Sequence, residues 1–393
     1  MSGTGRYCTF LFLIVAAVSN GTAPALAGNS KKSCLVDTDN DGLSNCAETD
    51  TGVFIGAWNT GTDPKVADTD EDGLSDGDEV NGTVGGLNLP ALGVSPVHKD
   101  ILLEYDWMDD AECGVAHSHR PTGAMLAIVR EAFANAPVGN PDGKNGIRVY
   151  QDVARLYSDP WGHAGLESGS NLIDDADGFI EGGVDDTNYI DEENANFDAN
   201  RRGYFHYVVF AHGYTASPGS SGQASILGHR MLITLACGYA DTRRVAYTIM
   251  HELGHNLGLL HGGDEACNRK PNYNSVMNYR FQFTGVMDCS LHPLGKTDYS
   301  SGVRRVLDEN ALIEGDGICR LQAAEQGGIP PIDWNHNNVI DPDPISYDVN
   351  FYPNSICPGL AELRDYNDWA NIRLTDVRAF ATVASDPCAT VPE

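Results

Sequence analysis

The residues best suited to chemistry lie in the eleven-residue segment HELGHNLGLLH. His251 and His255 are four residues apart, so on a helix they share one face and can hold one zinc ion. Glu252 follows the first histidine and can reach a water molecule on that metal. Gly258 tolerates a positive φ, so the chain can turn there and bring His261 to the same ion. Three histidine ligands leave a fourth position for water, which is typical of a catalytic zinc site.

A helix must carry the first two histidines, and Asp241 or Thr242 can cap its start. The apolar residues that recur every four positions are expected to face the core: Val245, Ile249, Leu253 and Leu257. The apolar run 231–236 is expected to be a buried strand before this helix. Solvated surface histidines are one alternative, and a zinc site without catalysis is another. The spacing of the histidines argues against surface residues, and the presence of Glu252 argues against a zinc site without catalysis.

A second pattern is acidic and occurs twice. Residues 37–48 read DTDNDGLSNCAE and residues 68–79 read DTDEDGLSDGDE, with eight of twelve positions identical. Acids at positions 1, 3 and 5, glycine at 6 and glutamate at 12 can surround one calcium ion with oxygen atoms. An acidic linker is the alternative, which two near-copies make improbable. The predicted ligands are Asp37, Asp39, Asp41, Leu43, Asn45 and Glu48, then Asp68, Asp70, Asp72, Leu74, Asp76 and Glu79.

The histidine motif resembles that of the metzincin clan of zinc endopeptidases. In that clan a methionine turn lies beneath the metal, and Ser275-Val276-Met277-Asn278-Tyr279 fits it. A tyrosine two residues after the methionine is similar to the astacin, serralysin and pappalysin branches. The resemblance implies an α/β (α+β) domain with a twisted mixed sheet, a backing helix and an active-site helix. It also implies that Tyr279 is a labile zinc ligand or an oxyanion donor.

The acidic repeats, with Thr62-Asp63-Pro64 between them, resemble thrombospondin type 3 calcium repeats over residues 35–83. The resemblance implies a structural calcium module with two or more ions rather than a calcium sensor. Weaker echoes occur at 174–178 and 333–344. For both, a polar surface turn is at least as good an interpretation.

Other segments supply the elements around the motif. Strands are expected at 101–107, 146–153 and 204–214, with a short edge strand at 224–227 that in the clan pairs with extended substrate. A helix is expected at 122–136, which makes a βαβ unit with a parallel strand pair. An acidic insertion at about 158–203 is expected to be a surface loop. The predicted organisation is a signal peptide at 1–27, repeats at 28–95, a peptidase domain at 96–376 and a tail at 377–393.

The start of the chain and the cysteines indicate export. Arg6, an 11-residue apolar run and Ala25-Leu26-Ala27 are typical of a secretory signal, with a buried N-terminal helix as the alternative. Nine cysteines follow the signal, so most are expected to pair and one to be left over. Cys237 is the favoured odd one, because it ends an apolar run. Cys267, Cys289, Cys319 and Cys357 are expected to staple the irregular C-terminal region, with the pairing left open.

Charge limits the partners. The chain has 25 Lys and Arg against 55 Asp and Glu, a net charge of −30, which excludes nucleic acid as a main partner. No run after the signal is long enough to span a membrane. The sequence thus predicts a secreted zinc endopeptidase that acts on protein or peptide substrates, with one catalytic zinc. One alternative is a calcium-dependent structural or adhesive surface protein with an inert zinc site, and a second is a zinc hydrolase of non-peptide bonds. The oligomeric state is not predicted.

Overall fold

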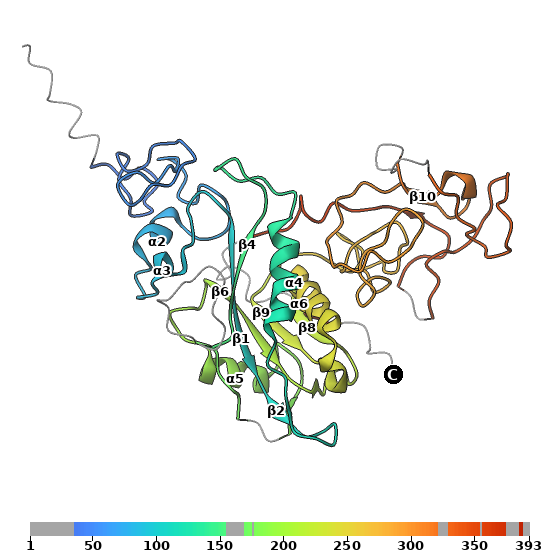
Figure 1. Cartoon of the computed structure of the whole chain (residues 1–393), viewed down its shortest axis with the longest axis horizontal. Helices are drawn as coiled ribbons and strands as arrows, with labels where there is room; N and C mark the ends of the chain where they lie inside the picture. The colour runs from blue at the N-terminus through green and yellow to red at the C-terminus, as the bar shows by residue number, and fades with distance from the viewer. Residues whose placement is uncertain are drawn as a thin grey trace, which may run out of the picture.

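The computed structural model describes residues 35–154, 169–174, 177–320, 329–353, 356–374 and 385–387. Its centre is a six-stranded mixed sheet with the strand order β12-β8-β9-β6-β1-β4 (Figure 1). Four neighbouring strands are parallel: β9 (Arg230–Ile233), β6 (Phe205–Phe210), β1 (Asp100–Trp107) and β4 (Arg148–Asp152). β8 (Gly222–Ser225) runs antiparallel to β9, and β12 (Ser385–Pro387) runs antiparallel to β8. The protein is therefore of the mixed α/β class, as predicted.

The predicted βαβ unit is confirmed as β1, α4 (Gly123–Ala134) and β4. Thr122 caps α4, since its side chain accepts a hydrogen bond from the Met125 amide. β1 and β4 are parallel, with Asp100 opposite Arg148. An Arg148–Asp100 ion pair at 2.5 Å fixes this end of the pair.

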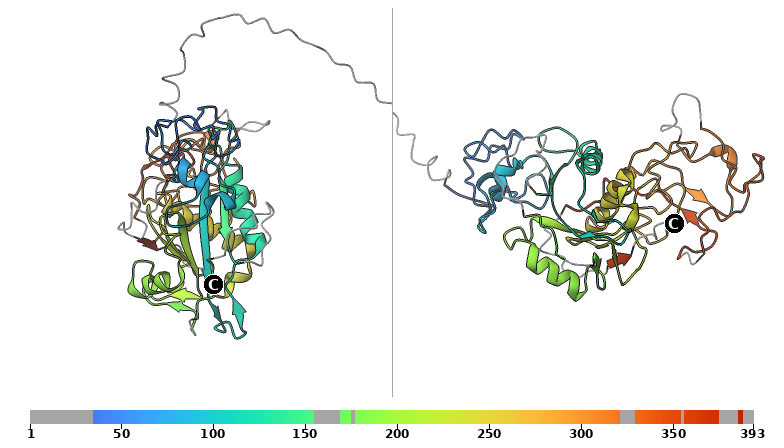
Figure 2. Two further views of the ribbon diagram at one scale, coloured as in Figure 1. Left: turned by 90° about the vertical axis from the view of Figure 1, so that its left-hand side faces the viewer. Right: turned by 60° about the horizontal axis from the view of Figure 1, so that its bottom comes forward.

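The two faces of the sheet are buried by different elements, because alternate residues of β1 point to opposite sides. Ile101, Leu103 and Tyr105 belong to a core formed with α4 and α6 (Thr242–Asn256). Leu102 belongs to a second core on the other face, which includes residues of α5 (Thr187–Asn196). Figure 2 shows the sheet between these helices. All eight residues of β1 are buried, as expected for a strand covered on both sides.

The prediction of a surface loop at 158–203 is wrong for its C-terminal part. Residues 187–196 form α5, from which Tyr189 and Glu193 are buried. Glu193 accepts hydrogen bonds from His229 and Arg202, both at 2.9 Å, and from Arg230 at 2.7 Å. Burial raises the pKa of Glu193, but the His229 and Arg230 contacts outweigh it and lower that pKa to about 2. These long-range ion pairs have no periodic sequence pattern. Residues 155–168 and 175–176 lie outside the described structure.

The acidic repeats lead into two short helices, α2 (Asp76–Asn81) and α3 (Leu89–Leu92). Leu74, Leu87 and Leu89 are part of the second core, together with residues of β1 and β6. The Asp100 amide, at the start of β1, donates to Asp72 Oδ2 at 2.7 Å. The second repeat is thus packed directly on the sheet.

The region after α6 has little regular structure, as predicted. Besides β12, its described elements are a strand pair, β10 (Leu307–Asp308) with β11 (Glu362–Leu363), and one turn of 3₁₀ helix, η2 (Glu314–Asp316). Two disulfides join this region, Cys267–Cys357 and Cys289–Cys319, which confirms the predicted staples. A third small core gathers around Trp334.

The prediction that Cys237 is unpaired is wrong. It is bonded to Cys113, 124 residues earlier in the chain. Cys237 lies in the 3₁₀ helix η1 (Ala236–Ala240), between β9 and α6, rather than inside the strand. Cys46 is also disulfide-bonded, whereas Cys34, Cys388 and the predicted signal at 1–27 lie outside the described residues.

Two further predictions concern membrane spans and the C-terminal tail. Within the described part of the chain, every helix is too short or too polar to cross a membrane. The predicted tail at 377–393 contributes β12, so this segment is not wholly separate from the sheet.

Candidate functional site

The three motif histidines come together as the spacing predicts. α6 begins at Thr242, where Asp241 accepts hydrogen bonds from two backbone amides, and it ends at Asn256. Gly258 follows with φ 94°, and a β-carbon there would lie 2.6 Å from Leu227. The positive φ favours glycine at this turn. One nitrogen from each of His251, His255 and His261 lies within 4.8 Å of the others.

The outer nitrogens of two histidines define which atom each presents to the centre. His251 Nδ1 lies 2.8 Å from the Val276 carbonyl oxygen, and His255 Nδ1 lies 2.8 Å from that of Leu259. A carbonyl oxygen only accepts, so each Nδ1 carries the hydrogen and each Nε2 of the neutral ring has a lone pair. Burial lowers the pKa of His255 to about 4 and holds those of His251 and His261 well below their ordinary value. The three rings are therefore neutral at pH 7.

This arrangement fits a zinc ion. His251 Nε2 is buried and has no hydrogen-bond partner among the described residues. The Nε2 atoms of His255 and His261 are 3.2 Å apart. Two nitrogens bound to one zinc at ~2.0–2.1 Å with tetrahedral angles would lie roughly 3.3 Å apart. The nitrogen donors are thus of the right type and nearly at the right spacing.

Glu252 lies next to this cluster and is fully buried. Its carboxylate is close to β8, because a β-carbon at Gly222 would lie 2.6 Å from Glu252 Oε1. Glycine at this position thus allows the carboxylate to approach the strand. A buried acid beside three neutral imidazoles can accept and return a proton.

The predicted methionine turn lies against the same helix. Met277 is fully buried, and a β-carbon at Gly254 would lie 2.3 Å from its sulfur atom. The Ser275 hydroxyl accepts a hydrogen bond from the Met277 amide at 3.2 Å, which holds the turn. Tyr279 reaches the histidines: its ring centroid is 4.2 Å from that of His261 and 5.9 Å from that of His251.

The short edge strand was predicted two residues too late. β8 is Gly222–Ser225, and Ile226 and Leu227 lie beyond it. Its inner side pairs with β9. Its outer side pairs with β12, with Pro387 opposite Gln223 and Ser385 opposite Ser225. The outer edge of β8, the strand close to Glu252, is thus occupied by β12 from the C-terminal end of the same chain.

The two acidic loops have the same backbone and the same hydrogen bonds. Asn40 and Glu71, at loop position 4, have φ 64° and 63°. Gly42 and Gly73, at position 6, have φ 97° and 93°. In each loop the position-1 aspartate accepts backbone amides, and the position-5 aspartate accepts the amide of the following leucine. The repeat in the sequence is therefore a repeat in structure.

The acids at positions 3 and 12 of each loop accept no such hydrogen bonds from the residues that the structure describes, unlike the aspartates at positions 1 and 5. Both carboxylate oxygens of each are buried without a hydrogen-bond partner among the described residues: Asp39, Glu48, Asp70 and Glu79. Burial, together with the neighbouring carboxylates, raises the pKa of Glu48 to about 7 and that of Asp70 to about 8. Unpaired buried carboxylates are costly unless a cation compensates them. A hard cation such as Ca²⁺ fits both loops, and the two position-12 glutamates each offer two oxygens.

The two predicted ligands at loop position 9, Asn45 and Asp76, do not make the contacts that the loop pattern predicts. The Asn45 side-chain oxygen accepts hydrogen bonds from the Thr38 amide and hydroxyl, both at 3.1 Å. Asp76 accepts from Thr69 and lies with Asp41 and Glu48 of the first loop. The side chains of Leu43 and Leu74, at position 7 of each loop, are buried. The first site thus draws on both repeats, which a single-loop pattern does not predict.

The weaker acidic echo at 333–344 has a similar backbone, with φ 58° at His336 and 69° at Asn338, but its side chains make different hydrogen bonds. Asp333 accepts the amides of Asn337 and Asn338, but Asn335 and Asn337 donate to Asp341. The polar side chains therefore pair with one another, as in a surface turn.

Comparison with protein-family models and with curated protein sequences gave no match. The case for a function accordingly depends on the residues and their geometry.

Proposed function

We propose that this protein is a secreted zinc endopeptidase of the metzincin type with a calcium-stabilised N-terminal module. The observation that carries the proposal is the convergence of three neutral imidazoles beside the buried carboxylate of Glu252. Met277 beneath α6 and Tyr279 beside His261 support the assignment to this clan. The disulfides support an extracellular location.

Each residue has a distinct role in the proposed reaction. His251, His255 and His261 hold the zinc ion, which when bound lowers the pKa of a water molecule and polarises the scissile carbonyl. Glu252 accepts a proton from the attacking water and delivers it to the leaving amine. The Tyr279 hydroxyl donates a hydrogen bond to the oxyanion that develops on the carbonyl oxygen.

Removal and restoration of zinc test this function directly. We expect about one zinc per chain to be bound at the three histidines and to be required for hydrolysis of a quenched fluorescent peptide library. Excess calcium is present throughout. A zinc chelator should abolish hydrolysis, and added zinc should restore it. His251→Ala with His255→Ala should lose both the metal at this site and the activity. A protein that binds zinc here but cleaves no peptide or casein under any condition would instead support the adhesive alternative.

Tyr279→Phe is expected to reduce kcat roughly tenfold to a hundredfold, with little change in KM or zinc content. The phenyl ring keeps the packing on His261, so only the hydroxyl contribution is lost. Steady-state kinetics with metal analysis measure this. Tyr352→Phe, at a tyrosine 49% exposed, is the matched control. Equal kcat values for Tyr279→Phe and wild type would remove Tyr279 from the mechanism.

The pairing of β12 with β8 predicts self-competition for substrate. An extended peptide binds by adding a strand to a sheet edge, and β12 covers the outer edge of β8. Asp386→Pro removes a backbone N–H opposite Ala224, so it should lower KM for long peptides by roughly twofold to tenfold.

Asp386→Ala keeps that N–H and is the control, with KM expected to equal that of wild type. The measurement is KM for peptides of four and of ten residues. If Asp386→Pro leaves both values unchanged, β12 does not compete with substrate.

A further inference from the structure

A second group of metal-binding side chains lies outside the zinc motif, at the edge of the sheet where β1 and β6 end. β1 leads into a two-stranded hairpin, β2 (Asp109–Asp110) and β3 (His117–Ser118), in which Asp110 pairs with His117. β6 ends at Phe210, beside the end of β1. Four side chains meet here, and we call them the histidine–aspartate cluster: Asp110, His117, His119 and His212.

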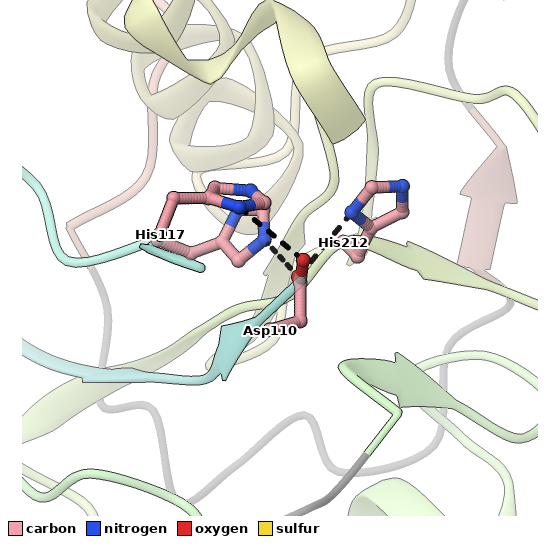
Figure 3. A group of neighbouring side chains, drawn as sticks. Asp110, His117 and His212 are labelled. Carbon is pink, nitrogen blue, oxygen red and sulfur yellow. Dashed lines mark hydrogen bonds and ion pairs between the residues drawn. The ribbon is translucent and has the colours of Figure 1, made fainter. Parts of the chain in front are cut away.

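The three histidines converge on one carboxylate, and Figure 3 shows His117 and His212 beside Asp110. His119 Nε2 lies 2.5 Å from Asp110 Oδ2, and His212 Nδ1 lies 3.2 Å from the same oxygen. His117 Nδ1 lies 3.4 Å from Asp110 Oδ1. One ligand atom from each of the four residues lies within 4.8 Å of the others.

Burial gives the cluster an inner and an outer side. The side chains of Asp110 and His119 are 1% and 0% exposed, whereas those of His117 and His212 are 24% and 11% exposed. An ion can therefore enter past the two outer histidines. His212 Nδ1 is itself buried and has no hydrogen-bond partner among the described residues, although it is directed at the carboxylate.

A network of hydrogen bonds alone accounts poorly for this geometry. Asp110 Oδ1 already accepts the Glu112 amide at 3.0 Å. Among the described ion pairs, Asp110 has only histidines as basic partners, and no lysine or arginine balances the carboxylate. Burial opposes the charged form of the His119 imidazole and lowers its pKa. A metal ion would use the nitrogen lone pairs and balance the carboxylate charge at once.

The surrounding chain is built to hold this arrangement. Cys113, in the turn between Asp110 and His117, is bonded to Cys237 and ties the hairpin to η1. The His119 amide donates to the Met108 carbonyl at 3.0 Å, and the His212 amide donates to that of Gly178 at 2.7 Å. A β-carbon at Gly178, where φ is 72°, would lie 2.7 Å from Asp110 Oδ2, so only glycine leaves room for this carboxylate.

We propose that the histidine–aspartate cluster binds a second divalent transition-metal ion, distinct from the zinc of the HELGH motif. Three imidazoles and one carboxylate complete a four-coordinate shell from the protein alone, which is typical of a structural zinc site. The ion would fix the β2–β3 hairpin to the end of β6. Tyr239 of η1, just before α6, packs on His119 with ring centroids 4.9 Å apart, whereas His251 lies nine residues beyond the start of α6, about 14 Å along the helix, so the two sites are separate.

Metal counting on the full chain tests this proposal. All proteins would carry Glu252→Gln, so that self-cleavage cannot alter the samples. Each is stripped with a chelator, dialysed against zinc with calcium present, freed of excess zinc and analysed by elemental mass spectrometry. The parent is expected to hold two zinc ions per chain. His117→Gln with His212→Gln should hold one, and His251→Ala with His255→Ala should also hold one.

Controls separate this site from the first. His292→Ala changes a histidine with a 78% exposed side chain and should still bind two ions. Cobalt loaded into the His251→Ala and His255→Ala protein should give the visible absorption of a four-coordinate nitrogen and oxygen site. That spectrum should vanish when His117 and His212 are also replaced. Circular dichroism and the thermal midpoint verify folding.

A parent that never exceeds one zinc per chain would overturn the proposal. So would a His117→Gln and His212→Gln protein that binds as much zinc as the parent. If that variant does not fold, the cobalt spectrum of the His251→Ala and His255→Ala protein decides alone: no bound cobalt means no second site. A failure here leaves the endopeptidase proposal intact, because that proposal depends on other residues.

Discussion

Replacing Glu252 with glutamine is expected to reduce kcat for peptide hydrolysis by about 10²- to 10⁴-fold while zinc content stays unchanged. Glutamine has nearly the same shape, so it fits against Gly222 as glutamate does. It cannot accept a proton from water at neutral pH. None of the three proposed zinc ligands is altered, and the nitrogen donors remain in place. Kinetics on one peptide, with zinc measured on the same preparation, test both parts.

A second glutamate provides the control for Glu252→Gln. Glu362→Gln, at a half-exposed glutamate paired with Arg364, should leave kcat and zinc content at wild-type values. A Glu252→Gln protein that keeps a tenth or more of wild-type activity would show that another group activates the water. Loss of zinc in this variant would show instead that Glu252 holds the metal site together.

The sequence predicted this site well because its residues are local. His251, Glu252 and His255 lie on one helix, and Gly258 sets a turn that returns His261. Helical periodicity and glycine's access to positive φ are enough to place all of them. The acidic loops were equally predictable, since their spacing is fixed within twelve residues. Their sharing of Asp76 was not predicted, because it depends on how the two loops pack.

Features that join distant parts of the chain could not be predicted from the sequence in this way. The Cys113–Cys237 bond spans 124 residues, and Cys237 was expected to be unpaired because it ends an apolar run. The histidine–aspartate cluster combines a hairpin after β1 with the residue two places after β6. Its only local signal is His117 and His119, two residues apart. β12 joins β8 from the far end of the chain, without a strong strand pattern.

Removing calcium is expected to make the repeat module sensitive to protease before the zinc site is affected. The buried oxygens of Asp39, Glu48, Asp70 and Glu79 lack hydrogen-bond partners among the described residues, so without a cation these carboxylates repel one another. Calcium binds the folded loops and not the unfolded chain, and so stabilises them by linkage. Nitrogen ligands hold the other metal, so calcium loss does not directly empty that site.

Trypsin gives this prediction a single reporter bond. Lys65 is the only lysine or arginine between residues 35 and 95, and it is exposed between the two loops. In the Glu252→Gln protein, a calcium-selective chelator should speed cleavage after Lys65 by about tenfold or more. A tenfold faster cleavage corresponds to a decrease of roughly 1.4 kcal/mol in the free energy of opening the loops. Mass spectrometry of timed samples identifies the cut.

Two comparisons make the result specific to calcium. Cleavage after Lys296, whose side chain is 59% exposed in the C-terminal region, should proceed at the same rate with and without calcium. Asp70→Asn should increase cleavage after Lys65 even in millimolar calcium, because it removes one charge from a buried carboxylate that lacks a hydrogen-bond partner among the described residues. Its initial rate on a short peptide should stay near the wild-type value when Glu252 is present. Equal cleavage after Lys65 in both conditions would mean that the loops do not depend on calcium, and that the acidic repeats are a solvated linker.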